Sequence, residues 1–180
     1  MRAKVLTTGM LAVGAAIGWA LHGPGTAEAP ARAARAELRD ADGNRVGTAT
    51  FTEEANGVRV VVDVSDLRPG RHGFHIHETG RCDPPDFQSA GGHFDPEGRE
   101  HGMENPAGPH AGDLPNLVVQ VDGTGRGNSL DPYVTLEGGE DSLFRNGGTA
   151  LVVHADPDDY YTDPSGDSGD RVACGIIERL

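Results

Sequence analysis

The chain has 180 residues, a length typical of one domain with a short appendage, which excludes a large multidomain enzyme. Its formal net charge of −13 repels phosphate backbones and anionic head groups, which argues against nucleic acid as a partner. Aromatic residues make up only 5%, whereas glycine and proline number 27 and 12, so a loop-rich globular domain is favoured over a coiled coil or helical bundle. The eight histidines are the unusual feature of this composition.

The N-terminal segment has the order of regions typical of an export signal. Arg2 and Lys4 precede an apolar run over residues 5–21, and a small-residue cleavage pattern follows it. The run is shorter than the roughly 20 apolar residues of a transmembrane helix, so an uncleaved membrane anchor is the less favoured alternative. We therefore expect residues 1–33 to be an export signal with a short linker and residues 34–180 to be the folded domain. The mature protein would be extracellular, in the cell envelope or periplasmic, without membrane contact.

The chain contains two cysteines, Cys82 and Cys174. In an oxidising compartment an even count favours a disulfide, and two buried thiols are the alternative. If the two cysteines pair, they close a loop of about 92 residues, for which chain entropy gives on the order of 4.6 kcal/mol of stabilisation.

Beyond about residue 34, apolar residues recur with a period of two, which is typical of strands. The clearest case is residues 58–64, where valine occupies every second position. Turn signals at 42–44 and 56–57 separate consecutive strands as in hairpins. The pattern predicts eight strands, at residues 36–40, 45–52, 58–64, 72–77, 116–121, 127–130, 149–154 and 171–177. Eight short strands with turn signals between them indicate an antiparallel sandwich or barrel.

Two stretches break the strand pattern, residues 78–113 and 155–170, and both are rich in glycine, proline and aspartate. A structureless segment of 36 residues inside a compact domain is improbable unless it is functional or disordered. The first stretch contains three histidines and one cysteine. Metal ligation together with a disulfide would explain how it stays ordered, and disorder is the alternative.

Histidines are concentrated in residues 72–110, which contain six of the eight. His75 and His77 lie two positions apart on a predicted strand, so both imidazoles project from one face and can reach one metal ion. Such a pair alone is weak evidence, because a surface strand is the commoner explanation. Imidazole suits copper and zinc, and carboxylate oxygen also suits zinc. Further candidate ligands follow along the chain: His93, His101, His110, Asp113 and His154.

Several separate motifs, taken in order, resemble the copper,zinc superoxide dismutase family over roughly residues 36–178. The motifs are GFHIHETGRC (73–82), SAGGHFDP (89–96), HAGDLPNL (110–117), GTALVVHADPDD (148–159) and RVACGII (171–177). The resemblance implies an all-β, eight-stranded antiparallel Greek-key β-sandwich or barrel with two long functional loops. It also implies an antioxidant oxidoreductase that disproportionates superoxide to dioxygen and hydrogen peroxide by Cu(II)/Cu(I) cycling.

The resemblance also assigns one copper ion and one zinc ion per chain to particular side chains. The implied copper ligands are His75, His77, His93 and His154. The implied zinc ligands are His93, His101, His110 and Asp113. His93 would bridge the two ions as an imidazolate and exchange a proton during the cycle, which makes it a catalytic residue.

Residues around the ligands receive roles from the same resemblance. Asp158 matches the family aspartate that links a copper histidine to a zinc histidine, and Arg171 matches the catalytic arginine that attracts and orients superoxide. Cys82 and Cys174 match the family's intrachain disulfide. The remaining His22 and His72 receive no role.

The segment before Arg171 departs from better-known family members because it is short and contains no lysine. The only lysine in the chain is Lys4. Asp170 directly precedes Arg171 and could weaken its attraction for anions. We therefore predict slower or more salt-insensitive capture of superoxide than in relatives with a long loop.

Three other functions are weighed against the enzyme. A copper-binding or copper-buffering protein of the same fold is the main alternative, and it would be indicated by the loss of a copper ligand. A mononuclear zinc hydrolase would need an open zinc position, but all four positions are filled. A purely structural sandwich gives no reason for the histidine spacing. The family includes monomers and dimers, so the sequence leaves both a monomer and a homodimer open.

Overall fold

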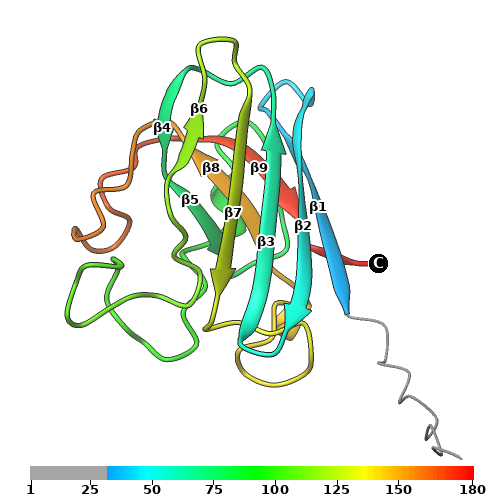
Figure 1. The fold of residues 1–180 in the computed structure, drawn as a ribbon, viewed down its shortest axis with the longest axis vertical. Coiled ribbons are helices and arrows are strands. Elements are labelled where there is room, and N and C mark those ends of the chain that lie inside the picture. The colour runs from blue at the N-terminus through cyan, green and yellow to red at the C-terminus, as the bar shows by residue number, and fades with distance from the viewer. Residues whose placement is uncertain (1–31) are drawn as a thin grey trace, which may run out of the picture.

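The computed structural model describes residues 32–180, and the predicted export signal lies outside them except for its last two positions (Figure 1). A single antiparallel sheet curls into a nearly closed barrel, which confirms the all-β prediction. No helix in the described part of the chain is long and apolar enough to cross a membrane.

The sheet contains ten strands rather than the predicted eight, in the spatial order β4-β6-β7-β3-β2-β1-β9-β8-β5, with β10 paired to β1. The strands are β1 (Ala33–Arg39), β2 (Arg45–Glu54), β3 (Gly57–Val64), β4 (Gly70–His72), β5 (Phe74–His77), β6 (Leu117–Val119), β7 (Gly125–Asp131), β8 (Ala150–His154), β9 (Arg171–Ile176) and β10 (Glu178–Arg179). Two short 3-10 helices lie in the connections, η1 (Gln88–Ala90) and η2 (Arg145–Gly147).

The interior of the barrel is filled by the apolar side chains that occupy alternate positions along the strands. In β3 the side chains of Val58, Val60, Val62 and Val64 are buried and belong to the main apolar core. The register of β2 against β3 pairs Phe51 with Val60, so large apolar residues of neighbouring strands enter the same core. Burial of apolar side chains on one sheet face is the main source of stability for such a barrel.

The predicted strand 72–77 is wrong as a single element, because it is interrupted at Gly73. β4 pairs with β6, whereas β5 pairs with β8, so the chain crosses between the two ends of the sheet at this residue. The Gly73 amide donates to the carbonyl of Asp156 at 2.7 Å, and a side chain at position 73 would collide with Ser168. Only glycine allows this close approach to the loop that follows β8.

The predicted strand 171–177 corresponds to β9, which ends one residue earlier, and a short additional strand, β10, follows beyond it. Ile177 lies between them, where its amide donates to the carbonyl of Thr149 at 3.0 Å. The remaining predicted strands coincide with observed strands to within a few residues at their ends.

Both long irregular loops are ordered in the structure, over residues 78–116 and 155–170. The predicted disulfide is present: Cys82 in the first loop is bonded to Cys174 in β9, with their Cα atoms 5.7 Å apart. Cys174 also packs against Phe87, Ala150 and Val152 in a small second apolar cluster. The first loop is therefore attached to the barrel at β9, beside the middle of β8.

Candidate metal centre

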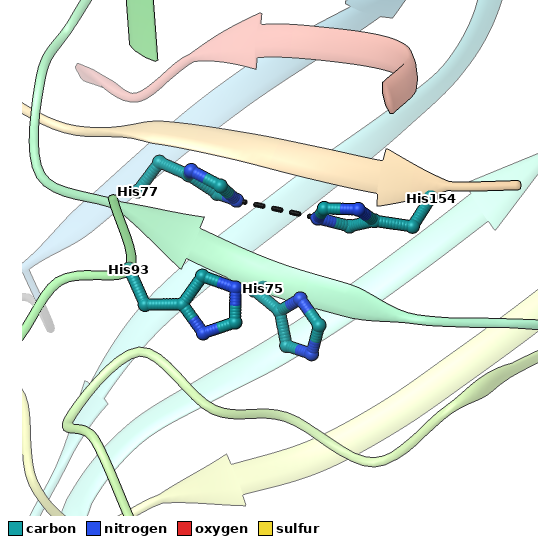
Figure 2. Close-up of side chains that lie close together, drawn as sticks. All are labelled: His75, His77, His93 and His154. Atoms are coloured by element: carbon teal, nitrogen blue, oxygen red, sulfur yellow. Dashed lines mark hydrogen bonds between the residues drawn. The ribbon is translucent and has the colours of Figure 1, made fainter. Parts of the chain in front are cut away.

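Strands β5 and β8 present three buried histidines to the outside of the barrel. In β5 the side chains of Phe74 and Ile76 enter the core, so the alternate residues His75 and His77 face the opposite way, toward the loops. His154 ends β8, which is the neighbour of β5 in the sheet. Figure 2 shows these three rings and that of His93 gathered around β5, with the rings of His77 and His154 pointing toward each other.

These four histidines form the first candidate ligand set, which we call the copper set: His75, His77, His93 and His154. One ring nitrogen of each lies within 4.8 Å of the others, and all four side chains are buried. The Nε2 atoms of His77 and His154 approach to 3.4 Å, and this contact is the dashed line in Figure 2.

The other ring nitrogens of the copper set are occupied by oxygen acceptors. His75 Nε2 donates to Asp158 Oδ2 at 2.8 Å, and His77 Nδ1 donates to the carbonyl of Gly91 at 3.0 Å. His154 Nδ1 donates to the carbonyl of Gly169 at 3.2 Å. These contacts fix the protonated nitrogen of each neutral ring and leave the lone pair of the other nitrogen facing its neighbours.

The unprotonated nitrogens of the four rings point their lone pairs toward one another, which is unfavourable because these lone pairs repel. A bound cation would accept these lone pairs and remove the repulsion. His75 Nδ1 and His93 Nε2 are buried and have no hydrogen-bond partner among the described residues. A buried polar atom without a partner costs about 1–3 kcal/mol, so such atoms point to a missing ligand. Four imidazole nitrogens suit copper, so the donor set fits that ion.

The second candidate ligand set, which we call the zinc set, comes from the loop after β5. It consists of His93, His101, His110 and Asp113. Asp113 Oδ1 lies 2.9, 3.1 and 3.5 Å from the Nδ1 atoms of these three histidines in order. Three imidazoles and one carboxylate are a donor set that suits tetrahedral zinc.

The carboxylate of Asp113 is held in place from its other side. Its Oδ2 atom accepts hydrogen bonds from the amides of Gly102 at 2.9 Å and His110 at 3.0 Å. His93 is the one ring shared by the two sets, since its Nδ1 atom faces Asp113 and its Nε2 atom belongs to the buried cluster of the copper set.

Asp158 contacts one ring of each set from the side away from the proposed metal positions. Its Oδ2 atom accepts from His75 Nε2 at 2.8 Å, and its Oδ1 atom accepts from His101 Nε2 at 3.0 Å. One carboxylate thus orients a ring of each set. Gly166 covers this link so closely that a Cβ atom there would overlap Asp158 Oδ1.

Asn116 holds Asp158, and the sequence analysis did not identify this role. The Asn116 amide side chain donates to the Asp158 carbonyl and accepts from the Asp158 backbone amide, both at 2.8 Å. The Asn116 backbone amide donates to the hydroxyl of Tyr160, also at 2.8 Å. Asn116 lies within the motif HAGDLPNL, so the sequence contained a signal, but its partner 42 residues away was visible only in the structure.

The protonation of the two sets differs. Burial lowers the pKa of His75 to about 3 and that of His154 to about 4, because the charged form of each ring is disfavoured away from water and next to the other imidazoles. These rings are therefore neutral near pH 7, the form that binds a metal. Burial also acts to lower the pKa of His101, but hydrogen bonds to Asp113 and Asp158 outweigh it and raise this pKa to about 9.

A pocket at the surface opens onto the copper set. It is lined by His77, His93 and His154 and by the guanidinium of Arg171. Arg171 Nη1 donates to the Phe87 carbonyl at 2.8 Å and Nη2 to the Gly91 carbonyl at 2.6 Å. The Gly91 carbonyl also accepts from His77, so one oxygen atom aligns both the guanidinium and a copper-set ring.

His72 is separate from both sets. Its Nδ1 atom lies 2.7 Å from the His154 carbonyl and its Nε2 atom 2.7 Å from the Arg68 carbonyl. The ring is buried and joins the segment before β4 to the end of β8.

Comparison with known proteins identifies the family that carries this arrangement. Residues 45–177 match the family model described as copper/zinc superoxide dismutase (SODC). The chain belongs to the copper/zinc superoxide dismutase family. This membership confirms the predicted activity, superoxide dismutation, and the predicted cofactors, copper and zinc.

Individual relatives agree with the family model. Superoxide dismutase [Cu-Zn] 2 of Aquifex aeolicus is 50% identical over 146 residues, which cover 80% of this chain and 85% of the relative. Superoxide dismutase [Cu-Zn] of Caulobacter vibrioides is 39% identical over 171 residues, which cover 93% and 98%. The crystal structure of a superoxide dismutase-like protein from Bacillus subtilis superposes with a TM-score of 0.76 at 41% identity, covering 79% of this chain and 96% of that one.

Proposed function

We propose that this superoxide dismutase binds copper at His75, His77, His93 and His154, and zinc at His93, His101, His110 and Asp113. One observation supports the proposal above all others. His93 contributes Nδ1 to one buried set and Nε2 to the other, and its Nε2 atom has no hydrogen-bond partner among the described residues. A single ring in this position suits a bridge between two different cations.

Copper, when bound, supplies one-electron acceptance and donation, and zinc supplies a fixed positive charge without redox chemistry. His93 is a catalytic residue through its Nε2 atom, which takes up a proton in one half of the cycle and releases it in the other. Its Nδ1 atom meanwhile stays in the zinc set, so the ring keeps its place. Asp158 keeps the rings of His75 and His101 oriented throughout by accepting from their Nε2 atoms.

Arg171 is proposed to bind and orient the superoxide anion. Its guanidinium lines the pocket next to the copper-set histidines, and it is a permanent cation. Its positive charge also acts to lower the pKa of both His77 and His154, which supports its closeness to them. Two backbone carbonyls hold the group in place.

The chain is proposed to be exported, with residues 1–33 acting as signal and linker and residues 34–180 as the mature domain. The Cys82–Cys174 disulfide supports this proposal, because disulfides persist in oxidising compartments. The proposed signal is cleaved, so the mature enzyme works without membrane contact. Superoxide is its substrate, and the strongly acidic composition argues against nucleic acid as a partner.

The decisive test combines metal analysis with a superoxide decay assay on the parent protein and on His154→Ala, before and after addition of copper. We expect His154→Ala to abolish superoxide consumption while its zinc content stays near one per chain. Retained activity in the copper-loaded variant would contradict the copper assignment. A copper-buffering role would instead leave the copper-loaded parent protein without activity.

A further inference from the structure

The loop between β5 and β6, which carries the zinc set, is contacted by the loop between β8 and β9 (Figure 1). Three residues of the second loop make these contacts, Asp158, Tyr160 and Asp163. Asp158 Oδ1 accepts from the ring of His101 at 3.0 Å, and Asp163 Oδ1 accepts from the His101 backbone amide at 2.8 Å. Tyr160 lies between these two carboxylates in the chain, and the proposed function gives it no role.

The hydroxyl of Tyr160 holds the backbone at Asn116. It accepts a hydrogen bond from the Asn116 backbone amide at 2.8 Å. The side chain of the same asparagine bonds both the backbone amide and the carbonyl of Asp158, each at 2.8 Å. Tyr160 and Asn116 are both partly buried, so water replaces the hydroxyl poorly as a partner of this amide. The hydroxyl therefore fixes the residue that in turn fixes Asp158.

The backbone of Tyr160 contacts both Asp158 and the loop of the zinc set. Its amide donates to Asp158 Oδ1 at 2.6 Å, the same oxygen that accepts from the ring of His101. Its carbonyl accepts from the Glu104 amide at 3.1 Å. A Cβ atom at Gly102 would lie only 2.2 Å from this carbonyl oxygen, so the two loops are in direct contact at this point.

Tyr160 makes these contacts in a backbone conformation that is uncommon for its residue type. Its φ is 67°, in the left-handed region that bulky residues rarely adopt. Such a conformation persists only where the surrounding contacts hold it, and it often marks a functional position. The next residue, Tyr161, is 54% exposed. The two adjacent tyrosines thus differ in environment, and Tyr161 offers a matched comparison for Tyr160.

We propose that Tyr160 is a positioning residue of the zinc set, which holds Asp158 through Asn116 and through its own amide and thereby slows the release of zinc. Zinc in this set belongs to the proposed function, on which the inference rests. Outer partners of a ligand ring fix its orientation, and their loss weakens metal binding by roughly 10- to 100-fold. The hydroxyl of Tyr160 acts one contact further out than Asp158, so we expect an effect at the lower end of this range.

The first measurement is the rate at which zinc leaves the copper- and zinc-loaded protein, followed with an excess of a coloured chelator. We expect Tyr160→Phe, which keeps the ring and removes the hydroxyl, to release zinc about tenfold faster than the parent protein. Tyr161→Phe is the matched control, and we expect it to release zinc at the parent rate because its side chain is exposed. Equal rates in the two variants would overturn the inference and leave the proposed function intact. A parent protein that binds no zinc would instead reject the proposed function, and the inference with it.

A double-variant cycle separates positioning through Asn116 from a general loss of stability. In Asn116→Ala the side chain that holds Asp158 is absent, so the Tyr160 hydroxyl no longer acts on Asp158 by this route. We expect Tyr160→Phe to accelerate zinc release by less than about twofold in this background, compared with about tenfold in the parent background. The same acceleration in both backgrounds would show that the two residues act independently and would overturn the inference.

Cobalt(II) at the zinc set, with reduced and colourless copper at the copper set, gives a readout that does not depend on turnover. Cobalt binds the same donor types as zinc, and its visible absorption bands report the geometry of the ligands. We expect these bands to shift in Tyr160→Phe and to coincide in Tyr161→Phe and the parent protein. Faster zinc release in Tyr160→Phe with cobalt bands like those of the parent protein would give Tyr160 a purely structural role and contradict the inference.

Discussion

The two ligand sets of this superoxide dismutase are supported by different parts of the molecule. Three of the four copper-set histidines stand on β5 and β8, where the strand ladder and the barrel core position them. Every member of the zinc set lies in the loop between β5 and β6. The strands of the barrel therefore position most of the copper set, whereas the zinc set is held in place by polar contacts within its own loop.

The sets also differ in how they balance charge. The copper set contains no carboxylate, and burial keeps the pKa of its histidines below the usual value. The zinc set contains Asp113, whose pKa burial acts to raise, but hydrogen bonds from His101, His110 and His93 outweigh burial and hold it well below the usual range. Removal of one charged partner from a buried set leaves the others uncompensated.

The largest effect is expected for Asp113→Ala. The variant removes a proposed zinc ligand together with the acceptor of two backbone amides, at a cost of about 3–5 kcal/mol for a broken buried pair. We expect its zinc content to fall to near zero and hydrogen exchange of residues 95–111 to increase, while β5 and β8 stay protected. Mass spectrometry of the native protein and of its exchanged peptides measures both quantities.

His154→Ala is the matched control for this prediction, because it removes one member of the strand-borne set. Hydrogen exchange in residues 95–111 is expected to stay at the parent level. Equal loosening of the loop in both variants would show that the two sets are not supported separately.

Gly166 and Gly98 provide a paired test of the contact that covers Asp158. Both have a left-handed backbone, with φ of 64° and 69°, but a Cβ atom at Gly98 would meet open space. Gly98→Ala therefore reports backbone strain alone, about 1 kcal/mol. Gly166→Ala adds displacement of the Asp158 carboxylate, and we expect a further loss of about 2–3 kcal/mol together with weaker zinc binding. Denaturant unfolding and zinc titration measure these changes, and equal losses in the two variants would exclude a role for the contact.

Asp131 can be compared with Asp113, because it is also a buried carboxyl group but has no histidine partners. Its Oδ1 atom accepts from the Tyr133 amide at 3.0 Å, whereas Oδ2 is buried with no partner among the described residues. Burial raises its pKa to about 7 from a usual value of 3.8. The folded state thus binds this proton more tightly than the unfolded state, and stability falls as pH rises from about 4 to about 7.

The variant Asp131→Asn removes this ionisation. At each pH we compare the free energy of unfolding of the variant with that of the parent protein. We expect this difference to favour the variant by about 2 kcal/mol more at pH 8 than at pH 5, because only the parent loses stability as Asp131 ionises. Urea unfolding at both pH values, with the same metal content, measures the difference. A gain that does not change with pH would show that Asp131 is not buried as a neutral acid.

The sequence predicted the barrel and the two clusters because both depend on local patterns. Alternating valines identify β3, and six of the seven proposed ligand residues lie inside the family motifs, with His101 between two of them. The structure brings all seven together into two buried groups that share His93, while metal ligation by them stays a prediction. The disulfide followed from an even cysteine count and an oxidising compartment.

Other features depend on contacts between distant segments and could not be read from a pattern. The interruption at Gly73 arises because the chain meets Ser168, almost a hundred residues away, and no period in the sequence reports that approach. The mutual amide contacts of Asn116 with Asp158 arise in the same way. The carbonyl of Gly91 is a backbone atom, so no side-chain motif indicates that it aligns both His77 and Arg171.

The two carbonyls that hold Arg171 belong to Phe87 and Gly91, in the stretch of loop that Cys82 attaches to β9. A newly made chain with both thiols still reduced has every ligand side chain but lacks the anchor of the segment that aims its guanidinium. We therefore expect the reduced chain to position Arg171 less firmly than the oxidised chain, even when both metals are supplied. Formation of this disulfide would then be a step of maturation in its own right, separate from metal binding.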